Sequence, residues 1–252
     1  MRRLDTEIFS RGLAASRSSA AAMIKNGQVT VNGAGVSKAS LDVGPDDVIE
    51  VSRGDVGKYV SRGGLKLEAI LDETGIDPSG CICCDIGSST GGFTDCLLKR
   101  GAAAVYAIDS GKDQLHPSLR NDKRVTVMEE TNARLLDGSF LPKKADVVTM
   151  DVSFISQTLI FPAVTGMLKE GGYLLSLIKP QFEAGRENVG KGGIVKDPAA
   201  RAKTVRGVTE SAEAHGLAPV KIIESPIRGG DGNVEYLAAF VKKQPEGSEK
   251  QS

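Results

Sequence analysis

From residue 64 onwards, apolar stretches of strand length alternate with segments of helical periodicity. The candidate strands lie at 81–86, 103–109, 125–128, 145–151, 173–179, 218–224 and 234–241. The helical patterns lie at 64–74, 92–100, 156–169 and 197–215. This alternation predicts an α/β domain in which helices cover both faces of a mostly parallel sheet.

The amino-terminal stretch follows a different pattern. Two short helical patterns, at 3–12 and 16–26, precede the β-rich sequence GQVTVNG, and Ser16 or Ser18 is suited to cap the second helix. The polar segment SRGDVGKY then separates this stretch from the rest. We therefore predict a small α+β domain at 1–52, a linker at 53–60, a larger α/β domain at 61–243 and a disordered polar tail at 244–252.

Three predicted strands end in the polar sequences CCDIG, VYAIDS and VVTMDVSF, and a fourth ends in LIKPQF. In an open α/β sheet, ligands bind outside the carboxyl ends of the strands. We therefore expect Asp85, Asp109, Asp151 and Lys179 to gather along one edge of the sheet.

A glycine-containing loop, Gly87 to Gly92, joins the first of these strands to a helix. Such a turn brings the backbone close to a ligand and aims amide donors at it. The glycines do not have the GxGxxG spacing of a dinucleotide site, which argues against an NAD-dependent enzyme and favours another adenine-containing cofactor.

Composition narrows the possibilities further. The net charge is zero, so nucleic-acid binding requires a local patch, and residues 1–38 carry six basic side chains against two acidic ones. No apolar run is long enough to span a bilayer and the chain does not begin with a secretion signal, so we expect a cytoplasmic protein without membrane contact. Four cysteines and two isolated histidines indicate buried thiols rather than a disulfide framework or a metal site.

Several side chains admit two interpretations. Asp109 is placed to bind ribose hydroxyls, although it could instead cap the next helix. The segment MEETNAR could meet an adenine amino group or form a simple turn. Asp151 and Lys179 close two strands that should be neighbours, as a functional pair or as a structural ion pair. Lys66 and Glu235 would join them only if the fold makes the four converge.

Five segments, in order, carry a resemblance to a known family: YVSRGGLKLE, DIGSSTGGFTDCLL, DVSFIS, LIKPQFEAG and GGDGNVEYL. They resemble the TlyA family, whose members were labelled haemolysins and are ribosomal RNA 2′-O-methyltransferases. The resemblance implies an S4-like RNA-binding domain followed by an FtsJ-like methyltransferase domain, with a Rossmann-like seven-stranded sheet that binds S-adenosylmethionine. It also implies a cytidine ribose of ribosomal RNA as substrate and ribosomal subunits as partners.

Matching positions carry the family's functional residues to this chain. The catalytic tetrad falls on Lys66, Asp151, Lys179 and Glu235. The cofactor site falls on Asp85, Gly87, Ser88, Ser89, Thr90, Gly91, Gly92, Phe93 and Asp109, with Glu130 and Asn132 expected near the adenine. The sequence HPSLR, at 116–120, departs from many relatives, which have an aromatic residue there.

The resemblance implies attack of a ribose 2′-hydroxyl on the sulfonium methyl group. Lys179 would act as the base, which requires burial and the nearby Lys66 to favour its neutral form; otherwise it stays charged and only steers the oxygen. We expect RNA phosphates to contact the basic side chains Arg3, Arg11, Arg17 and Lys25 of the first domain, although solvated surface charge is the alternative. The competing functions are a non-catalytic RNA-binding or ribosome-assembly protein and a membrane-active haemolysin.

Overall fold

The computed structural model describes residues 2–14, 16–25, 29–36, 38–51, 58–229 and 232–244, without the side chains of Ala22 and Lys25. The backbone divides into two compact units, Met1–Ser61 and Arg62–Ser252. Residues 53–57 of the predicted linker and 245–252 of the predicted tail lie outside the described residues.

Within its described residues, the first unit is a small α+β domain with two helices and two short antiparallel sheets. Its helices are α1 (Leu4–Ser10) and α2 (Arg17–Lys25). Its strands are β1 (Arg2–Arg3), β2 (Val29–Val31), β3 (Ala34–Gly35), β4 (Asp42–Val43) and β5 (Ile49–Val51), paired as β1-β4 and β3-β2-β5. The side chain of Ser16 accepts a hydrogen bond from the Ser19 amide at 3.0 Å, so Ser16 caps α2. The core consists of Leu4, Ile8, Ala20, Ile24, Val29, Val43 and Ile49.

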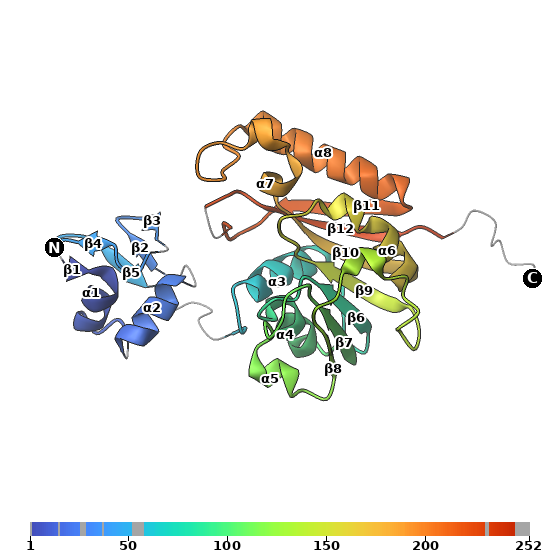
Figure 1. Cartoon of the computed structure of the whole chain (residues 1–252), viewed down its shortest axis with the longest axis horizontal. Helices are drawn as coiled ribbons and strands as arrows, with labels where there is room; N and C mark the ends of the chain where they lie inside the picture. The colour runs from blue at the N-terminus through green and yellow to red at the C-terminus, as the bar shows by residue number, and fades with distance from the viewer. Residues whose placement is uncertain are drawn as a thin grey trace, which may run out of the picture. The chain divides into compact units, whose positions relative to one another are not determined.

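The second unit is built on a seven-stranded sheet with the order β11-β12-β10-β9-β6-β7-β8 (Figure 1). The strands are β6 (Ile82–Ile86), β7 (Ala104–Ile108), β8 (Val125–Met128), β9 (Ala145–Met150), β10 (Leu168–Ile178), β11 (Leu217–Glu224) and β12 (Tyr236–Lys242). Strands β10, β9, β6, β7 and β8 run parallel, whereas β12 is antiparallel to both of its neighbours. The predicted mostly parallel α/β sheet is confirmed.

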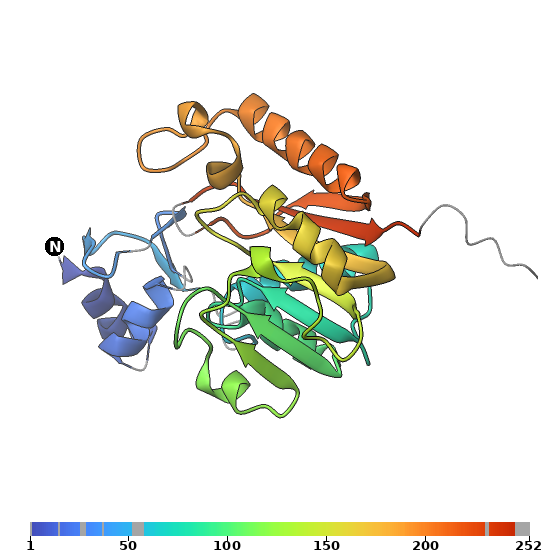
Figure 2. The same ribbon diagram turned by 45° about the vertical axis from the view of Figure 1, so that its right-hand side comes forward.

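Helices cover both faces of this sheet (Figures 1 and 2). On one face, α6 (Phe161–Met167) and α8 (Pro198–Ala214) pack on a core that includes Cys84 and Ile86 of β6. Asp85 lies between those two residues and bonds instead to α4 (Gly92–Lys99), which packs with α3 (Gly63–Thr74) on the opposite face. Short helices lie in the connections that follow β7, β8, β9 and β10: α5 (Pro117–Arg120), η1 (Ala133–Leu135), η2 (Gln157–Leu159), α7 (Pro180–Glu183) and η3 (Arg186–Asn188).

The largest difference from the predicted elements lies at 156–172. The pattern at 156–169 predicts one helix, but the chain forms the short turn η2 and then α6, which ends at Met167. Strand β10 begins at Leu168 because this residue already pairs with Ala145, and an irregularity carries the strand past Gly171 and Gly172 to Tyr173. Two consecutive glycines are typical of a turn, which is why the sequence predicts a later strand start.

The four cysteines are free thiols, as expected. Cys83, Cys84 and Cys96 are buried, and Cys81 is partly exposed.

Candidate active site at the carboxyl edge of the sheet

A cavity of about 300 Å³ lies at the carboxyl ends of the parallel strands. It is bounded by the segments that follow β6, β7, β8 and β9, so residues distant in sequence form its wall. The lining residues are Ile86, Gly87, Ser89, Ile108, Asp109, Ser110, Thr131, Asn132, Ala133, Arg134, Asp151, Val152, Ser153, Phe154, Ile155 and Ile160. Its size and its mixture of apolar walls and polar groups are typical of a small-molecule site.

The glycine loop contributes Gly87 and Ser89 to this cavity, but its glycines also serve packing. Gly87 has φ +77°, and a Cβ there would lie 2.5 Å from the carbonyl oxygen of Asp151. Gly91 has φ +95°, and its Cβ would lie 2.2 Å from Leu119. Both positions therefore need glycine whether or not a ligand is bound. The other predicted loop residues, Ser88, Thr90, Gly91, Gly92 and Phe93, do not line the cavity.

Asp85 lies inside the protein rather than at the cavity. Its carboxylate accepts hydrogen bonds from the Thr94 amide at 2.9 Å, the Thr94 hydroxyl at 2.6 Å and the Thr149 hydroxyl at 2.8 Å. Burial raises the pKa of Asp85 to about 6, although the bonds from the two threonines oppose this. Asp85 thus ties β6 to the start of α4 and to β9, a role that its place at a strand end does not reveal.

Asp109 lines the cavity and holds two of its loops. Its Oδ2 accepts from the Ser89 amide and its Oδ1 from the Gly111 amide, both at 2.7 Å. Each carboxylate oxygen has a further lone pair, so ribose hydroxyls could still be bound.

Of the two residues after β8 that were expected near the adenine, one lines the cavity and the other does not. Asn132 lines the cavity, and its side chain caps η1 by accepting from the Arg134 amide at 3.1 Å. Glu130 is exposed, does not line the cavity and lies 4.0 Å from Lys112. The preceding Glu129 accepts from three backbone amides of residues 113–115, and its contact with Arg120 lowers its pKa to about 2.

The four tetrad candidates form two ion pairs. Lys66 of α3 donates to Glu235 at 2.5 Å, and both side chains are buried. Lys179 lies 2.6 Å from Asp151 Oδ1. Ile178 of β10 pairs with Tyr236 of β12, so Lys179 directly follows and Glu235 directly precedes the paired ends of two neighbouring antiparallel strands. The structure thus gives each of the four residues a partner among the other three, which sequence spacing alone could not show.

The Lys179 pair borders the cavity. Its Nζ donates to the Ser153 hydroxyl at 2.9 Å, and both Asp151 and Ser153 line the cavity. The contact with Asp151 is an ion pair without hydrogen-bond geometry, so Asp151 Oδ1 can still accept from another donor. An ammonium and a carboxylate at the mouth of a cavity can orient a hydroxyl group.

Phe154 is a cavity residue that sequence reasoning missed. The residue is 91% exposed, its φ is +63°, and its ring centroid lies 5.1 Å from that of Phe182. Left-handed backbone is uncommon for a bulky residue and points to a functional constraint. The DVSF sequence carries no sign of this, because backbone angles cannot be read from residue type.

The predicted RNA-binding arginines all make ion pairs within the first unit. Arg3 donates twice to Asp5, at 3.1 and 3.0 Å, and Arg17 reaches the same carboxylate at 3.4 Å. The Arg3 contact, against the effect of burial, lowers the pKa of Asp5 to about 2. The side chains of Arg3 and Arg17 nevertheless remain 51% and 56% exposed.

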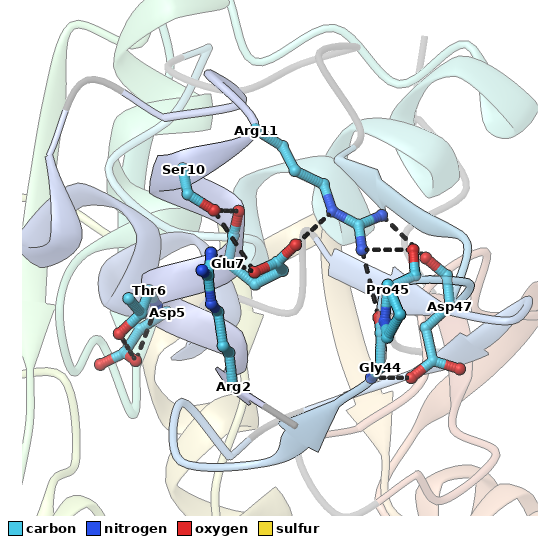
Figure 3. A network of polar contacts seen from close by, with 9 residues as sticks. All are labelled: Arg2, Asp5, Thr6, Glu7, Ser10, Arg11, Gly44, Pro45 and Asp47. Atoms are coloured by element: carbon cyan, nitrogen blue, oxygen red, sulfur yellow. Dashed lines mark hydrogen bonds and ion pairs between the residues drawn. The ribbon is translucent and has the colours of Figure 1, made fainter.

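Arg11 differs from the other two arginines (Figure 3). It pairs with Glu7 at 2.9 Å and donates to the carbonyl oxygens of Gly44, Pro45 and Asp47. Its guanidinium therefore joins α1 to the turn before β5. The side chain of Lys25 lies outside the described residues.

Comparisons with known proteins agree with this architecture. The FtsJ-like methyltransferase model matches residues 59–242, and the S4 domain model matches residues 2–49. A relative from Mycobacterium tuberculosis, the 16S/23S rRNA (cytidine-2′-O)-methyltransferase TlyA, is 43% identical over 93% of this chain and 88% of its own length. Hemolysin A of Brachyspira hyodysenteriae is 45% identical over 95% of this chain and 99% of its own.

A solved structure from Streptococcus thermophilus that carries the hemolysin name is 40% identical. It superposes with a TM-score of 0.76 over 96% of this chain and 88% of its own.

In the part of the chain that the structure describes, no helix has the length and apolar character needed to cross a bilayer. Within the same residues, no three His, Cys, Asp or Glu side chains cluster as metal ligands.

Proposed function

The chain belongs to the FtsJ-like methyltransferase family, and from this premise we propose that it methylates a ribose 2′-hydroxyl, that of a cytidine in ribosomal RNA, with S-adenosylmethionine as donor. The observation that supports this most is the Lys179–Asp151 pair at the edge of the cavity. A cofactor site and a pair that can orient a hydroxyl thus share one edge of the sheet. The TlyA relative bears the same activity in its name.

The cavity fits the proposed cofactor. Asp109 has free lone pairs for ribose hydroxyls, and Ile108, Ala133 and Ile160 offer apolar contact to a purine. Asn132 stands at the same wall, whereas Glu130 is displaced from it. When bound, S-adenosylmethionine supplies an electrophilic methyl group, so this chain's part is to place the acceptor hydroxyl and receive its proton.

Lys179 is the candidate group for that task, with Asp151 and Ser153 holding its ammonium. If Lys179 is the base, Lys179→Arg abolishes transfer, because arginine stays protonated. If it only steers the oxygen, the arginine variant keeps measurable turnover. Lys66 of α3 and Glu235, which directly precedes β12, form the second ion pair, and we expect it to hold the end of β12 in place.

Two further features suit an RNA substrate. The exposed ring of Phe154, backed by Phe182, offers a face on which an unpaired base can stack. The half-exposed Arg3 and Arg17 can contact phosphates, which contribute affinity without reading sequence. A ribosomal substrate places the reaction in the cytoplasm.

The test is methyl transfer from labelled S-adenosylmethionine to separated ribosomal subunits and to free ribosomal RNA, with mapping of the modified nucleotide. We expect one cytidine to be labelled by the native protein and by a Lys221→Ala control, which alters an exposed ion pair with Glu73. Lys179→Ala should lose transfer by at least about 100-fold. Failure of the native protein on every substrate, with RNA binding intact, would favour a non-catalytic assembly protein.

A further inference from the structure

The segment after β9 and the helix after β10 are joined at three successive points. At the first, Lys179 donates to Ser153. At the second, Phe182 packs against Phe154. Glu183 makes the third contact, one residue further along α7.

Glu183 binds the end of the segment through both carboxylate oxygens. Its Oε2 accepts from the Ser156 hydroxyl at 2.6 Å, and its Oε1 accepts from the Gln157 amide at 2.8 Å. The Gln157 side chain is buried and in turn accepts a hydrogen bond from the Ser176 hydroxyl of β10. The end of the segment is therefore anchored to both α7 and the sheet.

This anchoring matters because Phe154 is not held by its own burial. A left-handed φ at a bulky residue is strained and persists only where the surroundings impose it. The exposed ring of Phe154 provides little of that constraint. The bonds on either side, to Lys179 and to Glu183, hold the segment that bears it.

We propose that Glu183 is a positioning residue that holds the segment Asp151–Gln157 in its functional conformation, with Phe154 and Ser153 in place for the RNA substrate. This inference rests on the proposed function and adds to it. Glu183 acts through the segment and does not touch the reacting atoms.

The first test measures the mobility of the segment and does not depend on methyl transfer. The chain contains no tryptophan, so Phe154→Trp introduces a single emitter into this segment. Its time-resolved anisotropy is measured alone and combined with Glu183→Ala, Glu183→Gln or Glu187→Ala. Glu187 is an exposed carboxylate four residues along, so its removal matches the change in charge. We expect a larger fast-decaying fraction only with Glu183→Ala, because glutamine still offers an acceptor to the Gln157 amide.

The second test measures methyl transfer in variants that keep the native Phe154. Glu183→Ala should lower kcat by about 10- to 100-fold and change the KM for ribosomal RNA by less than about threefold. Glu183→Gln should retain most of the kcat, and Glu187→Ala should match the native protein. Every assay is run below the thermal transition of each variant.

Two results would overturn the proposal. One is that Glu183→Ala matches Glu187→Ala in both anisotropy and kcat. The other is a lower transition temperature with unchanged anisotropy, which would make Glu183 a residue of general stability. If the native protein itself transfers no methyl group, the proposed function fails, while the anisotropy measurement still decides whether Glu183 positions the segment.

Discussion

The ion pairs of the two units differ in how far water reaches them. In the methyltransferase unit, the side chains of Lys66 and Glu235 are 11% and 3% exposed. In the first unit, Asp5 is buried, but its partners Arg3 and Arg17 are half exposed. A buried charge that loses its partner cannot be stabilised by water instead. An exposed guanidinium, by contrast, can bind a phosphate while it keeps its ion pair. The first arrangement fixes geometry, and the second leaves charge available to a ligand.

The largest expected effect comes from breaking the buried pair. Glu235→Ala leaves the Lys66 ammonium buried without its partner, so we expect the methyltransferase unit to lose about 3–5 kcal/mol of stability. Calorimetry of the full chain should show this as a lower transition temperature for that unit. Removing both charges in Lys66→Met/Glu235→Leu should restore much of the stability without restoring methyl transfer. An undiminished transition in Glu235→Ala would contradict the assignment of the pair as buried and essential.

The second prediction concerns Asp85, a buried carboxylate that is held by hydrogen bonds from two threonines. Burial raises the pKa of Asp85 from 3.8 to about 6, so the folded state holds this proton more tightly than the unfolded state. The contribution of Asp85 to stability therefore falls as pH rises from about 4 to about 6, by about 3 kcal/mol, and stays constant above that range.

Asp85→Asn removes this titration while its amide can still bond to Thr94 and Thr149. The difference in unfolding free energy, variant minus native, should rise between pH 4 and 6 and then level off. A difference that does not change across that range would show that Asp85 titrates near its ordinary pKa.

The smallest effect is expected at the exposed pairs. Replacing Arg3 or Arg17 with glutamine should weaken RNA binding uniformly across sequences and reduce the slope of log K against log salt by about 0.7–0.9 each. Titrations of ribosomal RNA fragments at several salt concentrations measure this slope. Arg11→Gln is the contrast, because its guanidinium is bonded to Glu7 and to backbone carbonyls, and we expect lower stability with the slope unchanged. Equal salt-dependence slopes for the three variants would contradict the distinction between the exposed Arg3 and Arg17 and the bonded Arg11.

Much of the fold could be predicted from the sequence. Seven apolar runs correspond to the seven strands of the second unit, since continuous apolar runs are typical of strands buried on both faces. In the first unit, strands of two or three residues are too short to show an alternating pattern. Only β2 falls in a stretch predicted to be β-rich.

The site was less accessible to sequence reasoning. Strand ends predict that Asp151 and Lys179 share an edge, because parallel strands end together. The Lys66–Glu235 pair joins positions 169 residues apart, and the packing of α3 against the β12 side of the sheet brings them together. Arg11 resembles a phosphate ligand in sequence, yet the turn before β5 occupies its donors.

The contact between Gly87 and Asp151 restricts how this enzyme can change over evolution. Residue 87 lines the cavity, and any side chain there would displace the backbone carbonyl of Asp151. A mutation that alters the cavity at this position therefore also moves the strand end that carries Asp151. If the cavity holds the methyl donor as proposed, variation that adjusts its fit must arise elsewhere in the wall, at residues such as Thr131 or Ala133, which belong to a separate loop.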